Sequence, residues 1–278
     1  MQTVVRQADE VVDGEFELTQ RDFDRVRKLI HERAGISLNP GKKNMVYSRL
    51  SRRLRTLGLA SFSAYLDGVE SGSLDEDVEF VNALTTNLTS FWRESHHFPV
   101  LAAHLKKRAA QGADLRMWCC AASTGEEPYT IAITALEAGV GARFRLLATD
   151  IDTNVLDTGR AAIYPGERIA AIDEATKKRF FLRNSQGQVK LKPEVTSLVE
   201  FRQLNLLHPG WPVKGPFTAI FCRNVMIYFD KPTQYAVLRR LANLLEPGGL
   251  LFAGHSENFA DAKGYLRACG KTVYERCD

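Results

Sequence analysis

Two acidic residues follow apolar segments at positions that suit a nucleoside-containing ligand. Glu126 begins a helical pattern directly after the small-residue turn 121–125, which follows the apolar segment 115–120. A second apolar segment, 144–149, ends in Asp150. In doubly wound folds, an acidic residue at the tip of the second strand binds ribose hydroxyls, and the N–H groups that begin the first helix supply donors. Together these features predict a cofactor site, although an ordinary turn with a solvated Asp150 would show the same pattern.

The composition of the turn narrows the kind of cofactor. Gly125 is the single glycine of turn 121–125, so the dinucleotide fingerprint G-x-G-x-x-G is absent and NAD and FAD are disfavoured. A cofactor without a pyrophosphate needs a less close approach to the backbone. S-adenosyl-L-methionine therefore fits the turn better than a dinucleotide does.

The elements that must position these residues alternate between strand and helix. Expected strands are 115–120, 144–149, 217–222, 250–254 and 272–276, with a helix at 232–245. Such alternation predicts a parallel sheet with right-handed crossovers, whose ligands bind beyond the carboxyl ends of the strands. Glu126, Asp150, Asn205 and residues 222–224 would meet at that edge.

A second set of short apolar segments interrupts the alternation. Segments 180–183, 189–192 and 198–202 have the composition of strands, and the polar loop 184–188 separates the first two. We interpret them as an inserted antiparallel subdomain at about 178–203, whose last strand leads into the main sheet.

The N-terminal part of the chain is predicted to form a small helical domain. Residues 1–16 are expected to be a disordered tail, and residues 17–88 a set of short helices that precedes the domain at 89–278. Helix 42–57 carries six cations and no acidic residue: Lys42, Lys43, Arg49, Arg52, Arg53 and Arg55. Uncompensated like charges destabilise a helix, so they indicate either a solvated basic face or a docking face for an acidic helix or a phosphate backbone.

The segment 86–94 joins these two domains and is rich in polar and aromatic side chains. Asn87, Thr89 and Arg93 offer amide, hydroxyl and guanidinium groups, while Phe91 and Trp92 can exclude water from them. A capped connection between domains would have the same composition.

Composition excludes several classes of protein. The 278 residues are 45% hydrophobic and 25% charged, and a net charge of +4 is too mild to indicate a nucleic-acid binder. No run of 18 apolar residues is present, so neither membrane insertion nor export is expected. The five cysteines suit a reducing cytoplasm. His96 and His97 are adjacent and lack metal-ligand spacing, so no metal site is expected.

Residues 17–276 closely resemble the bacterial chemotaxis receptor methyltransferases, the CheR family. The motifs that carry the resemblance are Asn-Leu-Thr-Ser-Phe-Trp-Arg-Glu at 87–94, Ala-Ala-Ser-Thr-Gly-Glu-Glu-Pro-Tyr at 121–129, Asp-Ile-Asp at 150–152, Phe-Cys-Arg-Asn-Val-Met-Ile-Tyr-Phe-Asp at 221–230 and Gly-His-Ser-Glu-Asn at 254–258. The resemblance implies an α/β fold: a Rossmann-like class I methyltransferase sheet that binds S-adenosylmethionine, with a small N-terminal all-helical domain and an inserted antiparallel β-subdomain.

The resemblance also implies an activity and its residues. The implied reaction methylates glutamates on the helical cytoplasmic domain of chemoreceptors, giving methyl esters and S-adenosyl-L-homocysteine. Positions that match the family's cofactor contacts are Asn87, Thr89, Arg93, Glu126, Asp150, Asn205, Leu206, Arg223 and Asn224. Arg93 and Tyr228 match the residues that line the site of methyl transfer.

The resemblance gives the basic helix a possible partner. Arg49, Arg52, Arg53 and Arg55 are candidates for docking the acidic receptor helices. The loop after Arg183 looks short, which predicts independence from a C-terminal receptor pentapeptide tether. A non-catalytic S-adenosylmethionine-binding adaptor and a methyltransferase for another substrate stay open. Binding of RNA is disfavoured because Tyr47 is the single aromatic residue of helix 42–57.

Overall fold

The computed structural model describes residues 15–259, 262 and 264–277, and it divides into two compact units. The first unit ends at Thr86 and the second begins at Asn87. Most of the expected tail, residues 1–14, lies outside the described residues. The last two residues of that expected tail are described: the Phe16 ring packs edge-on against Phe62.

The first unit consists of short helices around a small apolar core. Its elements are α1 Gln20–Ala34, the 3-10 turn η1 Pro40–Lys42, α2 Lys43–Leu57, α3 Phe62–Ser71 and α4 Asp77–Leu84. Thr19 caps α1 by accepting a hydrogen bond from the Asp22 N–H, and Gly35 ends the helix at a φ of 69°. Val46, Leu50 and Leu54, which recur every four residues on α2, are fully buried, so one face of this helix packs in the core.

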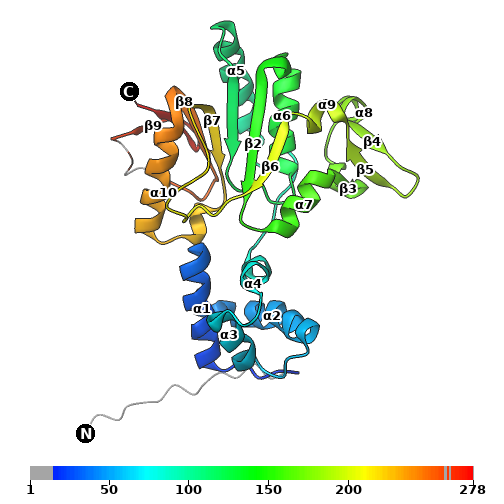
Figure 1. The fold of residues 1–278 in the computed structure, drawn as a ribbon. Coiled ribbons are helices and arrows are strands. Elements are labelled where there is room, and N and C mark those ends of the chain that lie inside the picture. The colour runs from blue at the N-terminus through cyan, green and yellow to red at the C-terminus, as the bar shows by residue number, and fades with distance from the viewer. Residues whose placement is uncertain (1–14, 260–261, 263, 278) are drawn as a thin grey trace. The chain divides into compact units, whose positions relative to one another are not determined.

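A seven-stranded sheet forms the centre of the second unit (Figure 1). Its strands are β1 Leu115–Cys119, β2 Phe144–Asp150, β6 Val199–Gln203, β7 Phe217–Cys222, β8 Leu245–Ala253, β9 Leu266–Gly270 and β10 Val273–Arg276. They lie in the order β6-β2-β1-β7-β8-β10-β9. The pairs from β6 to β8 are parallel, and β10 joins them antiparallel. This confirms the Rossmann-like sheet, to which the unpredicted β9 adds an edge strand.

Helices cover the two faces of the sheet, as alternate residues of β1 show. Leu115, Met117 and Cys119 belong to an apolar cluster with residues of α5 (His97–Ala110) and α6 (Glu126–Glu137). Trp118, on the opposite face, packs in a second cluster with residues of α10 (Lys231–Leu244). Because both faces are covered in this region, β7 is buried at all six positions, as its continuous apolar sequence predicts.

The inserted subdomain is a three-stranded antiparallel sheet, but its membership differs from the expectation. The strands are β3 Ile163–Pro165, β5 Gln188–Leu191 and β4 Phe181–Arg183, in the order β3-β5-β4. The segment expected to be its third strand is β6, which pairs with β2 of the main sheet. β3 was missed because Pro165 reads as a turn residue; as an edge strand, β3 tolerates a residue without an N–H. Four short helices lie in this part of the chain: α7 Thr153–Ala161, which contacts β2 and β6 of the main sheet, η3 Gly166–Ile169, α8 Glu174–Phe180 and α9 Pro193–Thr196.

No helix in the described part of the chain is long and apolar enough to cross a membrane.

Candidate active site

The turn between β1 and α6 is built around Gly125. This residue has a φ of 97°, and a Cβ atom there would lie 2.8 Å from Tyr164 Oη and 3.0 Å from Gly159 Cα. A side chain is therefore excluded by both the backbone conformation and the neighbouring subdomain. Gly125 is also the N-cap of α6, and no side chain caps this helix. The first turn of α6 thus begins at the carboxyl edge of the sheet, where donors for a ligand are needed.

Asp150 holds this turn in place from the end of β2. Its Oδ2 accepts a hydrogen bond from the Ser123 N–H at 2.8 Å, and its Oδ1 accepts one from the Asp152 N–H at 3.1 Å. Burial raises the pKa of Asp150 to about 6, although the N–H donors oppose this shift. A carboxylate has about four acceptor positions, so capacity remains for the hydroxyl pair of a ribose.

Glu126 places a second carboxylate beside the turn. It is fully buried, and its Oε2 accepts a hydrogen bond from Thr124 Oγ1 at 2.5 Å. Its Oε1 has no hydrogen-bond partner among the described residues, and the guanidinium of Arg168 lies 3.6 Å from it. A buried carboxylate oxygen without a donor is costly, so this atom fits an ammonium or hydroxyl group of a ligand.

The segment from Asn87 to Thr89 is bonded to both loops. Asn87 Nδ2 donates to Asp152 Oδ2 at 2.6 Å, and the Asn87 carbonyl accepts from Ser123 Oγ at 3.0 Å. The Thr89 carbonyl accepts from the Arg168 guanidinium at 3.2 Å. These bonds bring Asn87 and Thr89, which the resemblance alone pointed to, next to the loops that carry the two carboxylates.

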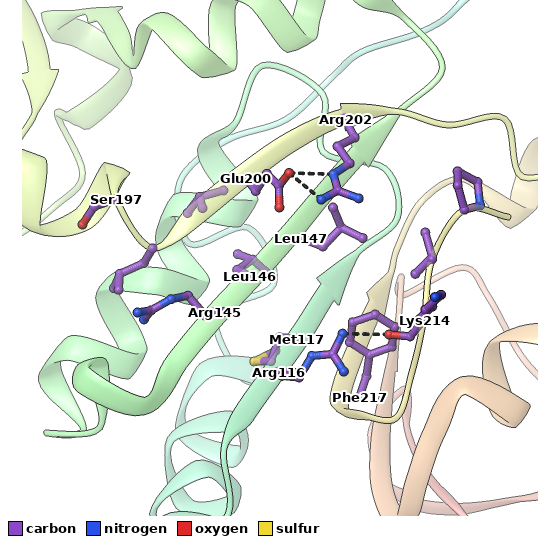
Figure 2. A pocket seen from close by; sticks show the side chains of 14 residues that line it. Arg116, Met117, Arg145, Leu146, Leu147, Ser197, Glu200, Arg202, Lys214 and Phe217 are labelled. Atoms are coloured by element: carbon purple, nitrogen blue, oxygen red, sulfur yellow. Dashed lines mark hydrogen bonds and ion pairs between the residues drawn. The ribbon is translucent and has the colours of Figure 1, made fainter.

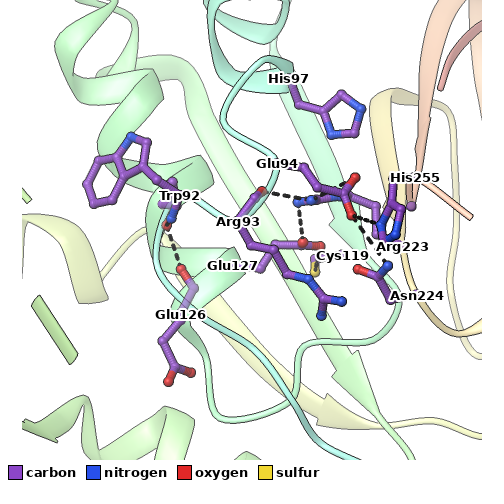
Figure 3. A network of polar contacts seen from close by, with 12 residues as sticks. Trp92, Arg93, Glu94, His97, Cys119, Glu126, Glu127, Arg223, Asn224 and His255 are labelled. Carbon is purple, nitrogen blue, oxygen red and sulfur yellow. Dashed lines mark hydrogen bonds and ion pairs between the residues drawn. The ribbon is translucent and has the colours of Figure 1, made fainter. Parts of the chain in front are cut away.

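Arg223 is a buried cation shared between two glutamates (Figure 3). Its Nη1 lies 2.6 Å from Glu127 Oε2, and its Nη2 lies 3.2 Å from Glu94 Oε2. Nη2 also donates to the Arg93 carbonyl at 2.7 Å. Arg223 is 3% exposed, and its guanidinium connects the Arg93 carbonyl with the Glu94 carboxylate.

The two glutamates of this network have opposite pKa shifts. Burial raises the pKa of Glu127, and the Arg223 charge opposes that shift. Burial also acts on Glu94, but Arg223 and hydrogen bonds from His255 and Asn224 outweigh it and lower the pKa of Glu94 to about 2. His255 Nδ1 and Asn224 Nδ2 both contact Glu94 Oε1, at 3.1 and 3.4 Å. Glu94 is thus a fixed anion at the edge of the site.

The loop after β7 is held by Glu257, which the sequence analysis did not assign to the site. The Glu257 carboxylate accepts four backbone N–H bonds, from Asn224, Val225, Met226 and Gly254, at 2.6 to 3.1 Å. It is 4% exposed, and burial raises its pKa against these donors. Its position after an apolar strand in Gly-His-Ser-Glu-Asn was the available signal, but the pattern alone does not show which N–H groups a carboxylate will find.

The two residues expected at the methyl-transfer site come from different elements. Arg93 is half-buried and donates from Nη1 to the Leu88 carbonyl at 2.7 Å, within its own segment. Tyr228 is half-buried on the short 3-10 helix η4 (Met226–Tyr228). Arg223 links the two elements because it belongs to the loop that leads to η4 and bonds the Arg93 carbonyl.

Asn205 and Leu206 follow β6 at the same edge. The Leu204 N–H donates to the Asp150 carbonyl at 2.9 Å, which places the two following residues next to the end of β2. Asn205 Oδ1 accepts from the Leu207 N–H at 2.9 Å, and Leu206 is buried. Among the described residues, no group of three or more His, Cys, Asp and Glu side chains could hold a metal ion.

Three of the four arginines of α2 have partners outside the helix, which corrects the expectation that its cations are uncompensated. Arg53 Nε donates to the buried Glu76 at 3.0 Å, and Arg55 Nε donates to Glu15 at 2.7 Å. Arg49 donates to the Thr85 carbonyl. The acceptors lie outside α2, so the sequence of the helix alone does not reveal them.

Arg52 differs from these three arginines. Its side chain is exposed, and the ion pairs of the described residues include none for it.

Comparison with known proteins identifies both units. A family model described as CheR methyltransferase, SAM binding domain matches residues 87–275, and one described as CheR methyltransferase, all-alpha domain matches residues 21–85. Chemotaxis protein methyltransferase 2 of Pseudomonas aeruginosa is 51% identical, over 94% of each chain. The chemotaxis protein methyltransferase of Salmonella typhimurium is 48% identical over 92% of this chain and 90% of its own length, and that of Escherichia coli is 47% identical over 92% and 91%.

Proposed function

This chain belongs to the CheR methyltransferase family, and we propose that it methylates glutamate side chains on the cytoplasmic helices of chemoreceptors. Its cofactor is S-adenosylmethionine, which the domain at residues 87–275 binds in this family. The observation that carries the proposal is the convergence of two buried carboxylates, Glu126 and Asp150, on the turn that begins α6.

The residues present fit this cofactor. Asp150 would hold the ribose hydroxyls. Oε1 of Glu126, which has no hydrogen-bond donor among the described residues, would accept from the ammonium group of the methionine part. Asn87, Thr89, Asn205, Leu206 and Asn224 would complete the cofactor site. When bound, S-adenosylmethionine supplies a sulfonium methyl group that a carboxylate can accept as a methyl ester, leaving S-adenosylhomocysteine.

The chain itself has little proton chemistry to perform. A substrate glutamate with an ordinary pKa of about 4.3 is already ionised at neutral pH, so no general base is required. The residues must orient the carboxylate and exclude water, and orientation of this kind supplies up to roughly 7–11 kcal/mol in favourable intramolecular cases. We assign Arg93 to holding the substrate carboxylate or the end of the cofactor. Tyr228 donates a hydrogen bond at the reacting groups.

We propose that α2 docks the acidic receptor helices. Arg52 and Arg55 are the accessible members of the four candidates; the exposed pair between Arg55 and Glu15 is weak enough to exchange for a receptor carboxylate. Arg49 and Arg53 bond the Thr85 carbonyl and the Glu76 carboxylate, and so hold α2 in position within the first unit. The chain works in the cytoplasm, where these receptor helices are found.

We further propose that methylation does not require a C-terminal receptor pentapeptide. The loop between β4 and β5 is short and internally bonded: Asn184 Oδ1 accepts from the N–H groups of Gln186 and Gln188 at 3.0 and 2.9 Å. A loop bonded internally in this way has few backbone groups left to pair with an added strand. Micromolar binding of a receptor C-terminal pentapeptide in calorimetry would refute this proposal.

The activity is tested by transferring labelled methyl from S-adenosylmethionine to purified receptor cytoplasmic domains. Mild base should then release the label from the receptor as methanol, as expected for a carboxyl methyl ester. Cofactor binding without labelled receptor would favour a non-catalytic adaptor, and base-stable label would indicate another acceptor group. A receptor domain whose methylation-site glutamates are replaced by alanine is the matched control.

A further inference from the structure

One face of the main sheet carries a cavity over β1, β2 and β6 (Figure 2). The described residues 204–216, which connect β6 to β7, contain no helix, and they border the cavity with Pro212, Val213 and Lys214. Its volume is about 550 Å³. Sites for small molecules commonly have volumes of roughly 300–1,000 Å³.

The charge of this cavity is strongly positive. Arg116 on β1, Arg145 on β2, Arg202 on β6 and Lys214 before β7 line it, and Glu200 is the one carboxylate among the lining residues. Four cations against one carboxylate leave a net charge of three positive. These four cations come from four separate segments of the chain. The positive charge of the cavity therefore results from the folding of the chain and not from a single basic helix.

Arg116 and Arg145 are direct neighbours across the β1–β2 ladder. Like charges at paired positions destabilise a sheet. The ion pairs of the described residues include none for either arginine; they donate instead to the carbonyls of Lys214 and Phe144, at 2.8 and 2.6 Å. Glu200 does not relieve them, because it pairs with Arg202 at 2.6 Å. Two guanidinium groups are thus left for an anion from outside the chain.

Apolar groups form the floor beneath these cations. Leu147 and Val213 are half-buried, and the Arg116 guanidinium lies 5.4 Å from the centre of the Phe217 ring. This contact restrains the Arg116 side chain over the floor. The side chain would therefore lose less conformational entropy when an anion binds. An apolar floor with converging cationic groups suits an organic molecule that carries phosphate.

We propose that this groove binds a phosphorylated small molecule of nucleotide size, with Arg116 and Arg145 as the phosphate clamp. Guanidinium groups bind phosphate oxygens in bidentate pairs, which a lysine does less well. Single-stranded nucleic acid fits poorly, because it needs exposed aromatic platforms. Phe217 is 3% exposed, and the nearby Trp211 ring is covered by Arg240 at 3.6 Å.

The site is separate from the cofactor site although it shares a strand with it. Arg145 is the second residue of β2 and Asp150 is the last. At about 3.3 Å per residue, their Cα atoms lie roughly 16 Å apart along the strand. A phosphate held by Arg116 and Arg145 therefore lies away from the cofactor site, although Arg202, which also lines the groove, pairs in register with Thr149 next to Asp150.

Calorimetry on the full chain tests the proposal, with inorganic pyrophosphate and ADP as probes. S-adenosylhomocysteine at saturation keeps ADP out of the cofactor site, and ionic strength is held constant. We expect saturable binding at one site per chain. The double variant Arg116→Gln, Arg145→Gln should weaken binding at least about tenfold, since two charge-assisted contacts are lost.

The matched control removes the same charge elsewhere in the second unit. Lys106 and Lys107 are exposed on α5 and do not line the groove, so Lys106→Gln, Lys107→Gln should leave affinity within about twofold. Removing neighbouring like charges should not lower the melting temperature of the groove variant. Absence of saturable binding, or equal loss in both double variants, would overturn the proposal. Tighter competing binding by a poly-glutamate peptide would assign the groove to an acidic protein segment instead.

Discussion

Nη1 of Arg223 lies 2.6 Å from Oε2 of Glu127, and these side chains are 1% and 9% exposed. A buried ion pair of this kind contributes little to stability by itself, but removing one partner leaves a buried charge without compensation. Since Arg223 also bonds the Arg93 carbonyl, the pair connects the start of α6 to the residues expected to handle substrate.

Replacing Arg223 by alanine should therefore destabilise the chain by about 3–5 kcal/mol, as measured by urea unfolding. Arg239→Ala, at an exposed position on α10, is the control and should have little effect. Adding Glu127→Gln to Arg223→Ala should recover part of the loss, because a buried carboxylate is then removed. If the double variant were less stable than Arg223→Ala alone, the ion pair would not be the cause.

Replacing Glu126 by glutamine should weaken S-adenosylhomocysteine binding by at least about tenfold, since a charge-assisted hydrogen bond is worth about 1.5–3 kcal/mol. Oε1, which has no hydrogen-bond donor among the described residues, is the atom expected to contact the cofactor, and glutamine removes the charge of the whole carboxylate. Glu137→Gln, at the other end of α6, should bind normally. Equal affinity of the two variants in calorimetry would show that Glu126 does not contact the cofactor.

Cofactor binding should depend on pH through Asp150. Burial raises the pKa of this carboxyl to about 6, so it is ionised above pH 6 and becomes protonated below it. Protonation removes an acceptor for the ribose hydroxyls, and the dissociation constant of S-adenosylhomocysteine should rise by up to about tenfold per pH unit below 6. Asp150→Asn should bind weakly at all pH values, whereas Asp157→Asn, at an exposed position on α7, should retain the wild-type profile. A flat profile for the wild type between pH 5 and 8 would contradict this role.

Charge reversal at an exposed position on α2 should weaken receptor docking without unfolding the first unit. Arg52→Glu should slow receptor methylation at low salt, with a smaller effect as salt screens the charge, and leave cofactor affinity unchanged. Arg21→Glu, at an exposed position on α1, is the control. Arg53→Glu is a poor probe, because it would place a like charge against the buried Glu76 and destabilise the first unit. Unchanged methylation by Arg52→Glu at low salt would exclude α2 as the docking face at this position.

The sequence predicted what depends on local patterns. Apolar segments located the main-sheet strands except β9, whose sequence Leu-Arg-Ala-Cys-Gly is mostly exposed and has no apolar run. The segment of β6 was also found, but it was assigned to the inserted subdomain. Asp150 and Glu126 could be placed because the carboxyl ends of parallel strands meet at one edge. The partners of Arg53 could not be predicted, since Glu76 lies 23 residues away on another element. Glu94 and Glu257 were missed for the same reason: their partners are set by the packing of separate loops.

The Glu257 carboxylate joins the two loops that follow the paired strands β7 and β8. It accepts N–H groups from the loop after β7 and from Gly254 at the end of β8. These amide protons are protected by one side chain, so they should exchange with deuterium together, at one common rate of opening. The loop that carries Asn224 would then open as a single step, and the carboxylate of Glu257 would set how often the cofactor edge is exposed to solvent.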